Sequence, residues 1–239
     1  MRVMVTGAAG YLGRIIARRL AANHELTLVD RRPGEARELP VDITDLTTVR
    51  QVARGQDAVI HCVALVRGRE HLPLGAFVHT IVLGTWTVAE ACALEGVSTL
   101  INISSVAADG FPASGEIQRK VGDPVCFSPT DRFYAISKHL GEAVANAYGV
   151  AFGLRVLNLR PGVLAGDGLN QGPERPGNAD RFWFAYVDPF DVADGVARAL
   201  ESTAAGTYQL VAARSDSLWD WEPASRDFGY APRNNWERL

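Results

Sequence analysis

Apolar positions along the chain follow two alternating patterns. Short runs that are almost continuously apolar are typical of parallel strands buried on both faces, and they occur at residues 2–6, 25–30, 57–64, 98–105, 152–159 and 207–212. Longer stretches repeat apolar residues every three to four positions, which predicts helices near 13–24, 44–54, 77–95, 130–148 and 189–202. Gly55, Gly96 and Gly149 follow three of these stretches and are expected to end the helices.

Strands that alternate with helices predict an α/β fold, a Rossmann-type doubly wound parallel sheet with helices on both faces. We expect a single domain over residues 1–239, with a dinucleotide-binding core at 1–160. The long segments 106–129 and 161–187 follow carboxyl ends of strands, where open α/β sheets bind ligands. Residues 161–187 and 213–239 are expected to form a small C-terminal substrate-binding portion.

The composition is that of a globular protein, with 47% hydrophobic and 21% charged residues. The formal net charge of −3 gives no electrostatic reason to expect nucleic acid or an anionic membrane as a partner. We expect no membrane span, which needs about 18 apolar residues, and no signal region before the first strand.

Three cysteines have spacings that match no metal site, so we expect no metal. Cys62 and Cys92 lie among apolar residues and are expected to be buried thiols. Cys126 lies in a loop, where lining a pocket is the alternative to a core position. An odd number of cysteines fits a reducing, cytoplasmic location.

The segment VTGAAGYLG joins the first predicted strand to the first helix. Gly7 permits a tight turn, Gly10 lets the backbone approach a pyrophosphate, and Gly13 lets the helix pack close to the strand. The N–H groups at the helix start, around Tyr11 and Leu12, then face the phosphates. An ordinary glycine turn is the alternative, but the flanking strand and helix favour dinucleotide binding.

Asp30 ends the second strand, where a carboxylate binds the adenosine ribose hydroxyls and repels a 2′-phosphate. This favours NAD over NADP. Arg31 and Arg32 leave NADP open, because a guanidinium can hold a phosphate, although a solvated turn is the preferred interpretation. Asp42, followed by Ile43, can reach the adenine amino group; as an alternative, Asp42 caps the next helix.

YAISK places Tyr134 and Lys138 four residues apart, hence on one face of a predicted helix. Reducing a carbonyl needs an acid at its oxygen, and oxidising an alcohol needs a base at the same place. A lysine ammonium and a cationic nicotinamide both favour the tyrosine phenolate; lowering a tyrosine pKa by ~3 units takes about 4 kcal/mol. Ser105 would hold the substrate oxygen, and Lys138 would also bond the nicotinamide ribose. A core tyrosine and a surface lysine are the alternative.

Together these motifs resemble the short-chain dehydrogenase/reductase superfamily, in particular its extended, epimerase/dehydratase-like branch. TGAAGYLG is similar to the family's cofactor turn, and YAISK to its tyrosine–lysine pair. The resemblance of ISSVAADG implies a catalytic hydroxyl at Ser105, with Ser104 as second choice. DAVIHCVA resembles the strand whose end, at Ala64, backs the cofactor, and LRPGVLAG the segment with Pro161 that closes over the nicotinamide.

Within that branch the chain is most similar to uronate dehydrogenases. NADRFWF resembles the segment that carries their substrate-binding arginine, which implies Arg181 here, beside Trp183. Those enzymes have Asn-His after the catalytic serine, whereas this chain has Val106 and Ala107. We therefore expect Val106 to contact a substrate less hydroxylated than a uronic acid. Ile81 stands where relatives usually carry an asparagine, which in some of them supports a proton relay.

We therefore predict an NAD(P)-dependent oxidoreductase that transfers a hydride to or from a small alcohol or carbonyl compound. One alternative is an epimerase or dehydratase that recycles its cofactor within one turnover, and another is a cofactor-sensing regulator without chemistry. Arg67, Arg69 and His71 either meet an anionic substrate or lie in a solvated loop. The helices at 77–95 and 130–148 are apolar on more than one side, which predicts a homodimer, as the resemblance also implies.

Overall fold

The computed structural model describes residues 1–32, 34, 38–65, 71–110, 118–127, 132–166, 168 and 185–235. Within these residues, seven strands form one sheet in the order β3–β2–β1–β4–β5–β6–β9, and every neighbouring pair is parallel. The strands are β1 (Arg2–Thr6), β2 (Glu25–Asp30), β3 (Leu39–Pro40), β4 (Ala58–His61), β5 (Thr99–Ile103), β6 (Arg155–Pro161) and β9 (Gly206–Leu210). The predicted Rossmann-type architecture is confirmed.

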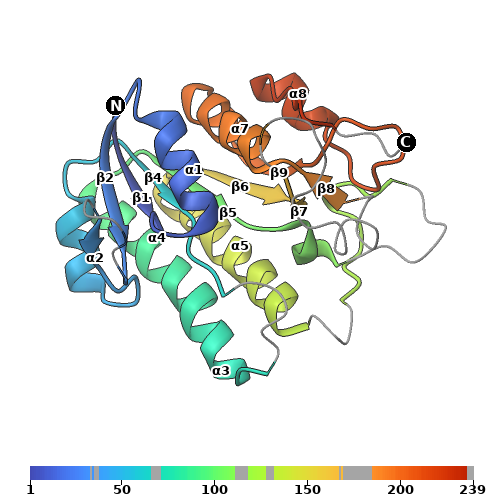
Figure 1. Cartoon of the computed structure of the whole chain (residues 1–239). Helices are drawn as coiled ribbons and strands as arrows, with labels where there is room; N and C mark the ends of the chain where they lie inside the picture. The colour runs from blue at the N-terminus through green and yellow to red at the C-terminus, as the bar shows by residue number, and fades with distance from the viewer. Residues whose placement is uncertain are drawn as a thin grey trace.

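Helices cover both faces of the sheet, as Figure 1 shows. One face carries α1 (Tyr11–Leu20) and α7 (Pro189–Glu201), which pack on each other, and α8 (Glu222–Phe228) beside them. The other face carries α2 (Leu46–Ala53), α4 (Gly84–Glu95) and α5 (Arg132–Phe152). The sheet is therefore buried between two helical layers, as its continuously apolar strands require.

Two apolar cores lie on the two faces, and β1 contributes to both. Val3 and Val5 belong to the core shared with α1 and α7, whereas Met4 belongs to the core shared with α2 and α4. This alternation is the two-residue period of a strand. Buried polar residues stand toward the carboxyl ends of four strands, at Thr6, His61, Asn102 and Asn158, and this edge of the sheet becomes the candidate site.

The predicted helix 77–95 is part of a longer helical run with three backbone geometries. It consists of α3 (Leu74–Phe77), the π-helical η1 (Val78–Leu83) and α4. Among the described residues, this run alone is long and apolar enough to cross a membrane by length and composition, yet half of its apolar window is buried in the fold. The run packs against α2 and α5, which accounts for the apolar residues on those sides.

The predicted end of the helix at 130–148 is wrong by one turn. α5 continues past Gly149, and Gly153 takes the left-handed backbone angle, with φ of 68°, just after it. Gly149 remains helical, and a Cβ there would lie 3.2 Å from the Leu154 carbonyl oxygen. Gly55 and Gly96 have φ of 75° and 70° and follow their helices as predicted.

A smaller apolar cluster lies beyond the carboxyl edge of the sheet. Strand β7 (Val163–Leu164) pairs with β8 (Tyr186–Val187), and the turn η2 (Val106–Asp109) follows β5. Trp219 is completely buried there. The Arg119 N–H donates to the Leu218 carbonyl oxygen over 2.7 Å, so the segment after β5 is joined to the C-terminal segment.

Candidate active site

The loop between β1 and α1 is a tight turn with three closely packed glycines. Gly7 has φ of 68°, and the Gly10 N–H donates to the Gly7 carbonyl oxygen over 3.0 Å. A Cβ on Gly13 would lie 2.1 Å from that same oxygen, so a side chain there would push α1 away from β1. The turn that the sequence predicts is therefore present.

The amino end of α1 has no side-chain cap, whereas Asp45 caps α2 and Asp188 caps α7. The first N–H groups of a helix have no partner within it, and the helix dipole makes this end electropositive. Such an end binds phosphate. Leu12 packs against the core, and the Tyr11 hydroxyl donates to the Gly166 carbonyl oxygen over 3.3 Å, which brings the loop after β7 over the turn.

The Asp30 carboxylate lies at the end of β2, directly beside the glycine turn. One oxygen accepts from the Ala9 N–H over 3.2 Å, and the other accepts from the Arg32 N–H over 3.0 Å. These bonds fix the negative charge at the end of the strand. The side chains of Arg31 and Arg32 are exposed.

Asp42 and Ile43 follow β3. Asp42 is exposed and accepts from the Thr44 N–H over 3.0 Å and from its hydroxyl over 2.8 Å. These hydrogen bonds lower the pKa of the Asp42 carboxyl. The alternative role of Asp42 as a helix cap is wrong, because Asp45 caps α2. Ile43 is buried and packs on Gly84 of α4.

Ala64 and Pro161, expected beside the cofactor, lie at the carboxyl ends of β4 and β6, the two strands that flank β5. Pro161 is the last residue of β6 and is buried, whereas Ala64 follows β4 and is half-buried. The backbone of Cys62 approaches the glycine turn closely, since a Cβ on Gly7 would lie 3.1 Å from the Cys62 carbonyl carbon. Both residues are thus at the edge that carries the glycine turn.

Ser105 begins the η2 turn directly after β5. Its Oγ accepts from the Ala107 N–H over 3.2 Å, which leaves the hydroxyl hydrogen available to donate to a substrate oxygen. Ser104, the second choice, is 4% exposed, and its Oγ has no hydrogen-bond partner among the described residues. Ser105 is half-buried and is therefore the accessible hydroxyl of the two.

The predicted substrate contact at Val106 is wrong. Val106 is 1% exposed and packs against Ala185, Val211 and Trp219. Ala107 is buried to the same extent. Val106 points into the apolar cluster and Ala107 is buried, so the apolar character of these two residues carries no information about the polarity of the substrate.

Tyr134 and Lys138 lie one turn apart on α5. Lys138 is 4% exposed, and its Nζ donates to the Ile103 carbonyl oxygen at the end of β5 over 2.6 Å. Burial lowers the pKa of Lys138 to about 8, partly opposed by Cys62 and Glu142. Tyr134 is half-buried. Because Ile103 stands two residues before the predicted catalytic serine, the lysine and that serine meet at one strand end.

A row of buried polar side chains crosses the sheet next to this point. Thr6, His61, Asn102 and Asn158 are in register on β1, β4, β5 and β6. Thr6 Oγ1 lies 2.8 Å from His61 Nδ1, and the Asn102 amide donates to Asn158 over 2.8 Å. Burial, with the Lys138 charge, lowers the pKa of His61 to about 3, so this imidazole is neutral.

A buried group of charges that the sequence analysis missed lies behind the predicted catalytic residues. Arg160 of β6 donates through Nε and Nη2 to the two oxygens of Glu142 on α5, over 2.8 and 2.6 Å. Its Nη1 donates to the carboxylate of Asp109, the last residue of η2. All three side chains are at most 5% exposed. The only sequence signal is charged residues within otherwise buried elements.

Ile81, where relatives are expected to carry an asparagine, is 1% exposed in the π-helical turn. Its carbonyl oxygen accepts from the Thr85 hydroxyl over 2.6 Å. Burial raises the pKa values of the Cys62 and Cys92 thiols to about 12, and Cys126 is exposed. Within the described part of the chain, no cluster of His, Cys, Asp and Glu could hold a metal ion.

Several predicted residues lie outside the described residues: Arg181, Trp183, Arg67 and Arg69. His71 is described and exposed. Tyr186, three residues after Trp183, is 3% exposed and belongs to a small apolar group with Ala165. The prediction of an aromatic and arginine contact to substrate therefore stays a prediction.

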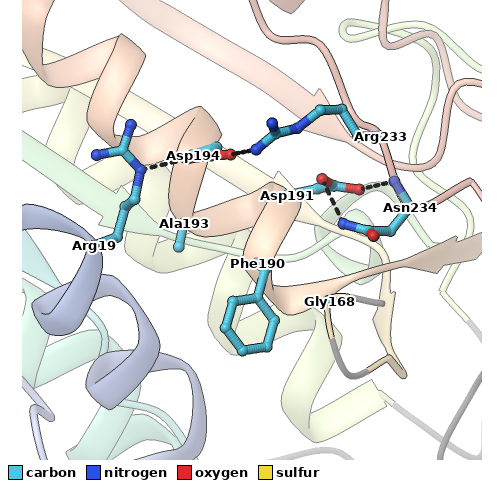
Figure 2. A pocket seen from close by; sticks show the side chains of 8 residues that line it. All are labelled: Arg19, Gly168, Phe190, Asp191, Ala193, Asp194, Arg233 and Asn234. Atoms are coloured by element: carbon cyan, nitrogen blue, oxygen red, sulfur yellow. Dashed lines mark hydrogen bonds and ion pairs between the residues drawn. The ribbon is translucent and has the colours of Figure 1, made fainter. Parts of the chain in front are cut away.

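A cavity of about 530 Å³ lies between α1, α7 and the C-terminal segment. Figure 2 shows Arg19 and Arg233 reaching Asp194 from opposite sides, while Asp191 accepts from Asn234. The Asp191 carboxylate also accepts from the Asn234 backbone N–H over 2.8 Å. These contacts hold the C-terminal segment against α7, and they pair the charged side chains that line the cavity with one another or with Asn234.

Comparison with known proteins decides the family. Residues 3–231 match the profile of the NAD dependent epimerase/dehydratase family. The chain belongs to this family. The members named below are NAD-linked dehydrogenases and dehydratases, which supports an enzyme and argues against the cofactor-sensing regulator.

Two relatives align over nearly the whole chain. The L-arabinose 1-dehydrogenase (NAD(P)(+)) of Haloferax volcanii is 28% identical, and the match covers 98% of this chain and 97% of the relative. The uronate dehydrogenase of Pseudomonas putida is 29% identical, with 99% and 85% covered. The resemblance to uronate dehydrogenases is confirmed at the level of family relatives.

Solved structures share the fold. The crystal structure of uronate dehydrogenase from Agrobacterium tumefaciens superposes with a TM-score of 0.80 at 21% identity, covering 97% of this chain and 84% of that one. A dTDP-glucose 4,6-dehydratase from Streptomyces venezuelae with NAD bound gives a TM-score of 0.79 at 22% identity, with 98% and 92% covered. Dehydrogenases and dehydratases thus share this architecture.

Proposed function

We propose that this protein is an NAD-dependent dehydrogenase that oxidises a hydroxyl-bearing carbon of a small free substrate of about monosaccharide size, or reduces the corresponding carbonyl. The proposal rests chiefly on Ser105 and Lys138, which lie at the carboxyl end of β5, on the same sheet edge as the glycine turn after β1. A hydride acceptor and an acid–base pair would therefore meet at one place.

The residues at this edge fit NAD. The glycine turn leaves no space for a Cβ at Gly13, the start of α1 is uncapped, and Asp30 presents a fixed carboxylate at the end of β2. These are the features that a pyrophosphate and an adenosine ribose require. When bound there, NAD supplies the hydride acceptor or donor.

Three side chains would carry the proton chemistry. The Ser105 hydroxyl would donate to the substrate oxygen and hold it beside Tyr134. In the oxidation, the Tyr134 phenolate would take the hydroxyl proton while the hydride leaves the same carbon, so that a carbonyl forms. The Lys138 ammonium would favour the phenolate by its charge. Reduction would run the same steps in reverse.

The size of the substrate follows from the chain between β6 and α7. That connection comprises only residues 162–188, far shorter than a typical domain of about 50 residues or more, so a nucleotide diphosphate would have little to hold it. The two relatives covered almost completely are named for L-arabinose and uronate. Because Val106 and Ala107 are buried, nothing now argues against a hydroxylated substrate.

An assay of NADH formation tests the proposal. We expect absorbance at 340 nm to rise when the protein and NAD meet free pentoses, hexoses or uronic acids, and not with UDP- or dTDP-sugars. Conversion of a nucleotide sugar without net NADH, by protein that retains NAD through purification, would instead establish the epimerase or dehydratase alternative. That alternative is kept because the family includes such enzymes.

We also propose a cytoplasmic homodimer whose C-terminal portion, residues 161–187 and 213–239, binds the substrate with Arg181 and Trp183. The unpaired cysteines among the described residues support a reducing location. The net charge of −3 supports neither nucleic acid nor membrane as a partner. The dimer is supported by apolar side chains exposed on the two helical runs, among them Leu83, Trp86, Ile136 and Leu140.

A further inference from the structure

Lys138 is a buried lysine whose hydrogen bond gives it no counter-charge. The sequence contains 24 basic residues, of which only Lys120 and Lys138 are lysines. Lys138 is buried, and its one hydrogen-bond partner among the described residues is the neutral Ile103 carbonyl oxygen. A buried ammonium without a counter-charge tends to lose its proton, yet the proposed function needs it charged beside Tyr134.

The carboxylate of Glu142, which raises the pKa of Lys138, belongs to the buried group of charges on α5, β6 and η2. Glu142 stands one turn after Lys138, but both of its oxygens are bonded to the Arg160 guanidinium. One carboxylate and one guanidinium sum to zero charge. Asp109 adds a second carboxylate to the same guanidinium, so the three side chains together carry a charge of −1. With Lys138 included, these four side chains sum to zero charge, and the buried Arg119 guanidinium beside Asp109 brings the total to +1.

We propose that Asp109, joined to Glu142 through Arg160, supplies the counter-charge that keeps the buried Lys138 protonated, and that Asp109 and Glu142 are thus positioning residues for the reaction. The inference rests on the proposed function, because it concerns the charge state of that same site. It also assigns a role to a group of charges that the acid–base steps do not use.

The other titratable groups around these residues do not replace this counter-charge. His61 at the end of β4 is neutral, and burial keeps the thiol of the next residue, Cys62, protonated. Around Asp109, the Arg119 guanidinium contacts the Asp109 carbonyl oxygen at 3.3 Å, and His139 meets the adjacent Ala108 carbonyl oxygen at 3.2 Å. Burial raises the pKa of Asp109, and Arg160 acts against it.

The same contacts fix geometry as well as charge. Asp109 ends the turn that Ser105 begins, Glu142 belongs to the helix of Tyr134, and Arg160 belongs to β6. A guanidinium shared by two carboxylates joins these three elements at fixed separations. One buried ionic group therefore joins the turn that carries Ser105 to the helix that carries Tyr134.

Lysine NMR tests the proposal without any substrate. Protein labelled with ¹³Cε-lysine gives two signals, which the Lys120→Arg variant assigns. We expect the Lys138 signal to titrate at lower pH in Asp109→Asn, with about a tenfold larger acid dissociation constant. Asp123→Asn is the matched control. Asp123 also lies between β5 and α5, but it is exposed and accepts from the Lys120 backbone N–H. This variant should leave the titration of Lys138 unchanged.

If Asp109→Asn does not fold, Glu142→Gln provides a second test of the same shift in the Lys138 titration. Asp109→Glu keeps the negative charge, so its Lys138 signal should titrate as in the wild type. In the wild type, the Lys138 signal should also respond at acidic pH when the Asp109 carboxylate protonates. Unchanged Lys138 titration in a folded Asp109→Asn or Glu142→Gln variant would overturn the proposal, as would a flat wild-type signal at acidic pH. A normal NMR result from an inactive protein would instead place the failure in the proposed function.

Discussion

Asp30 commits both of its carboxylate oxygens to backbone N–H groups beside the glycine turn. A negative charge fixed in this way would repel the 2′-phosphate of NADP, while Arg31 and Arg32 remain exposed. We therefore predict that NAD binds more tightly than NADP. Fluorescence titration with both cofactors measures this. Tighter binding of NADP would mean that the arginines determine the preference.

The variant Asp30→Ala sharpens this prediction. It should reduce the ratio of the NAD affinity to the NADP affinity, chiefly by weakening NAD binding. The control is Arg31→Ala, which should leave the affinity for NAD within about twofold, since exposed side chains contribute little. A preference for NAD that survives in Asp30→Ala would show that another residue excludes the 2′-phosphate.

The buried charge of Lys138 should reduce the stability of the fold, because burial disfavours the ammonium form. Its pKa of about 8 lies below the ordinary value of 10.5, so the folded protein holds this proton more weakly than the unfolded chain does. The resulting penalty is complete below pH 8 and disappears as the pH rises toward 10.5. At pH 7 it amounts to about 3 kcal/mol.

We predict that Lys138→Met abolishes turnover and removes this penalty. Urea unfolding at pH 7 and near pH 10.5 measures the effect. Loss of the hydrogen bond to Ile103 lowers stability equally at both pH values, so the pH-dependent difference isolates the charge. The variant should gain about 3 kcal/mol at pH 7 relative to pH 10.5. An equal effect at both pH values would contradict a buried ammonium.

At the residue scale, the sequence predicts those site residues whose partners lie only a few positions away along the chain. Gly7 and Gly13 lie in contact at the turn between β1 and α1, and Tyr134 and Lys138 lie one helical turn apart on α5. The charges behind them could not be predicted, because Arg160 meets partners 18 and 51 residues away. The Val106 prediction failed because the turn after β5 decides which way that side chain points.

At the scale of elements, the packing of α1 against β1 depends on one position. A Cβ at Gly13 would lie 2.1 Å from the Gly7 carbonyl oxygen, so Gly13→Ala must displace the helix. We predict a loss of about 1–3 kcal/mol of stability, as overpacking costs, and at least tenfold weaker NAD binding. Thermal unfolding and NAD titration measure the two effects.

The control is Gly75→Ala on α3, where no atom lies within 4 Å of the added Cβ. Alanine is the better helix former, so this variant should be as stable as the wild type or slightly more so. Normal NAD binding by Gly13→Ala would refute the role of the glycine turn in cofactor binding.

Element boundaries were predicted less well than element types. The sequence indicates that a helix ends near Gly149, but the next strand begins later and Gly153 makes the turn. The π-helical turn η1 and the short strands β7 and β8 were not predicted either. Their geometry is set by neighbouring elements, which a periodic pattern of apolar residues does not describe.

At the scale of the whole molecule, α4 and α5 lie side by side with apolar side chains facing outward. Trp86 is 52% exposed although its Nε1 donates to the Tyr148 hydroxyl, and Leu140 is 43% exposed. Such a surface favours a partner, and we predict a homodimer at micromolar concentration. Light scattering measures the mass, and Leu140→Glu should give a folded monomer. A monomeric wild type would contradict the prediction.

The topology of the sheet could be predicted as a class because strands and helices alternate from residue 2 onward. The match of residues 3–231 to the NAD dependent epimerase/dehydratase family agrees with it. The substrate could not be predicted in the same way. The segments that approach it connect the regular elements, and their side chains follow no periodic pattern that places them.

The most direct test of the account is the variant Tyr134→Phe, which removes one hydroxyl and leaves the ring. With a substrate identified in the NADH assay, we predict that kcat falls by about 10²–10⁴, the range expected for loss of a general acid–base. NAD binding should stay within about threefold of the wild type, since glycine turn and Asp30 are untouched. Near-normal kcat in Tyr134→Phe would contradict the assignment of Tyr134 as the proton-transferring group.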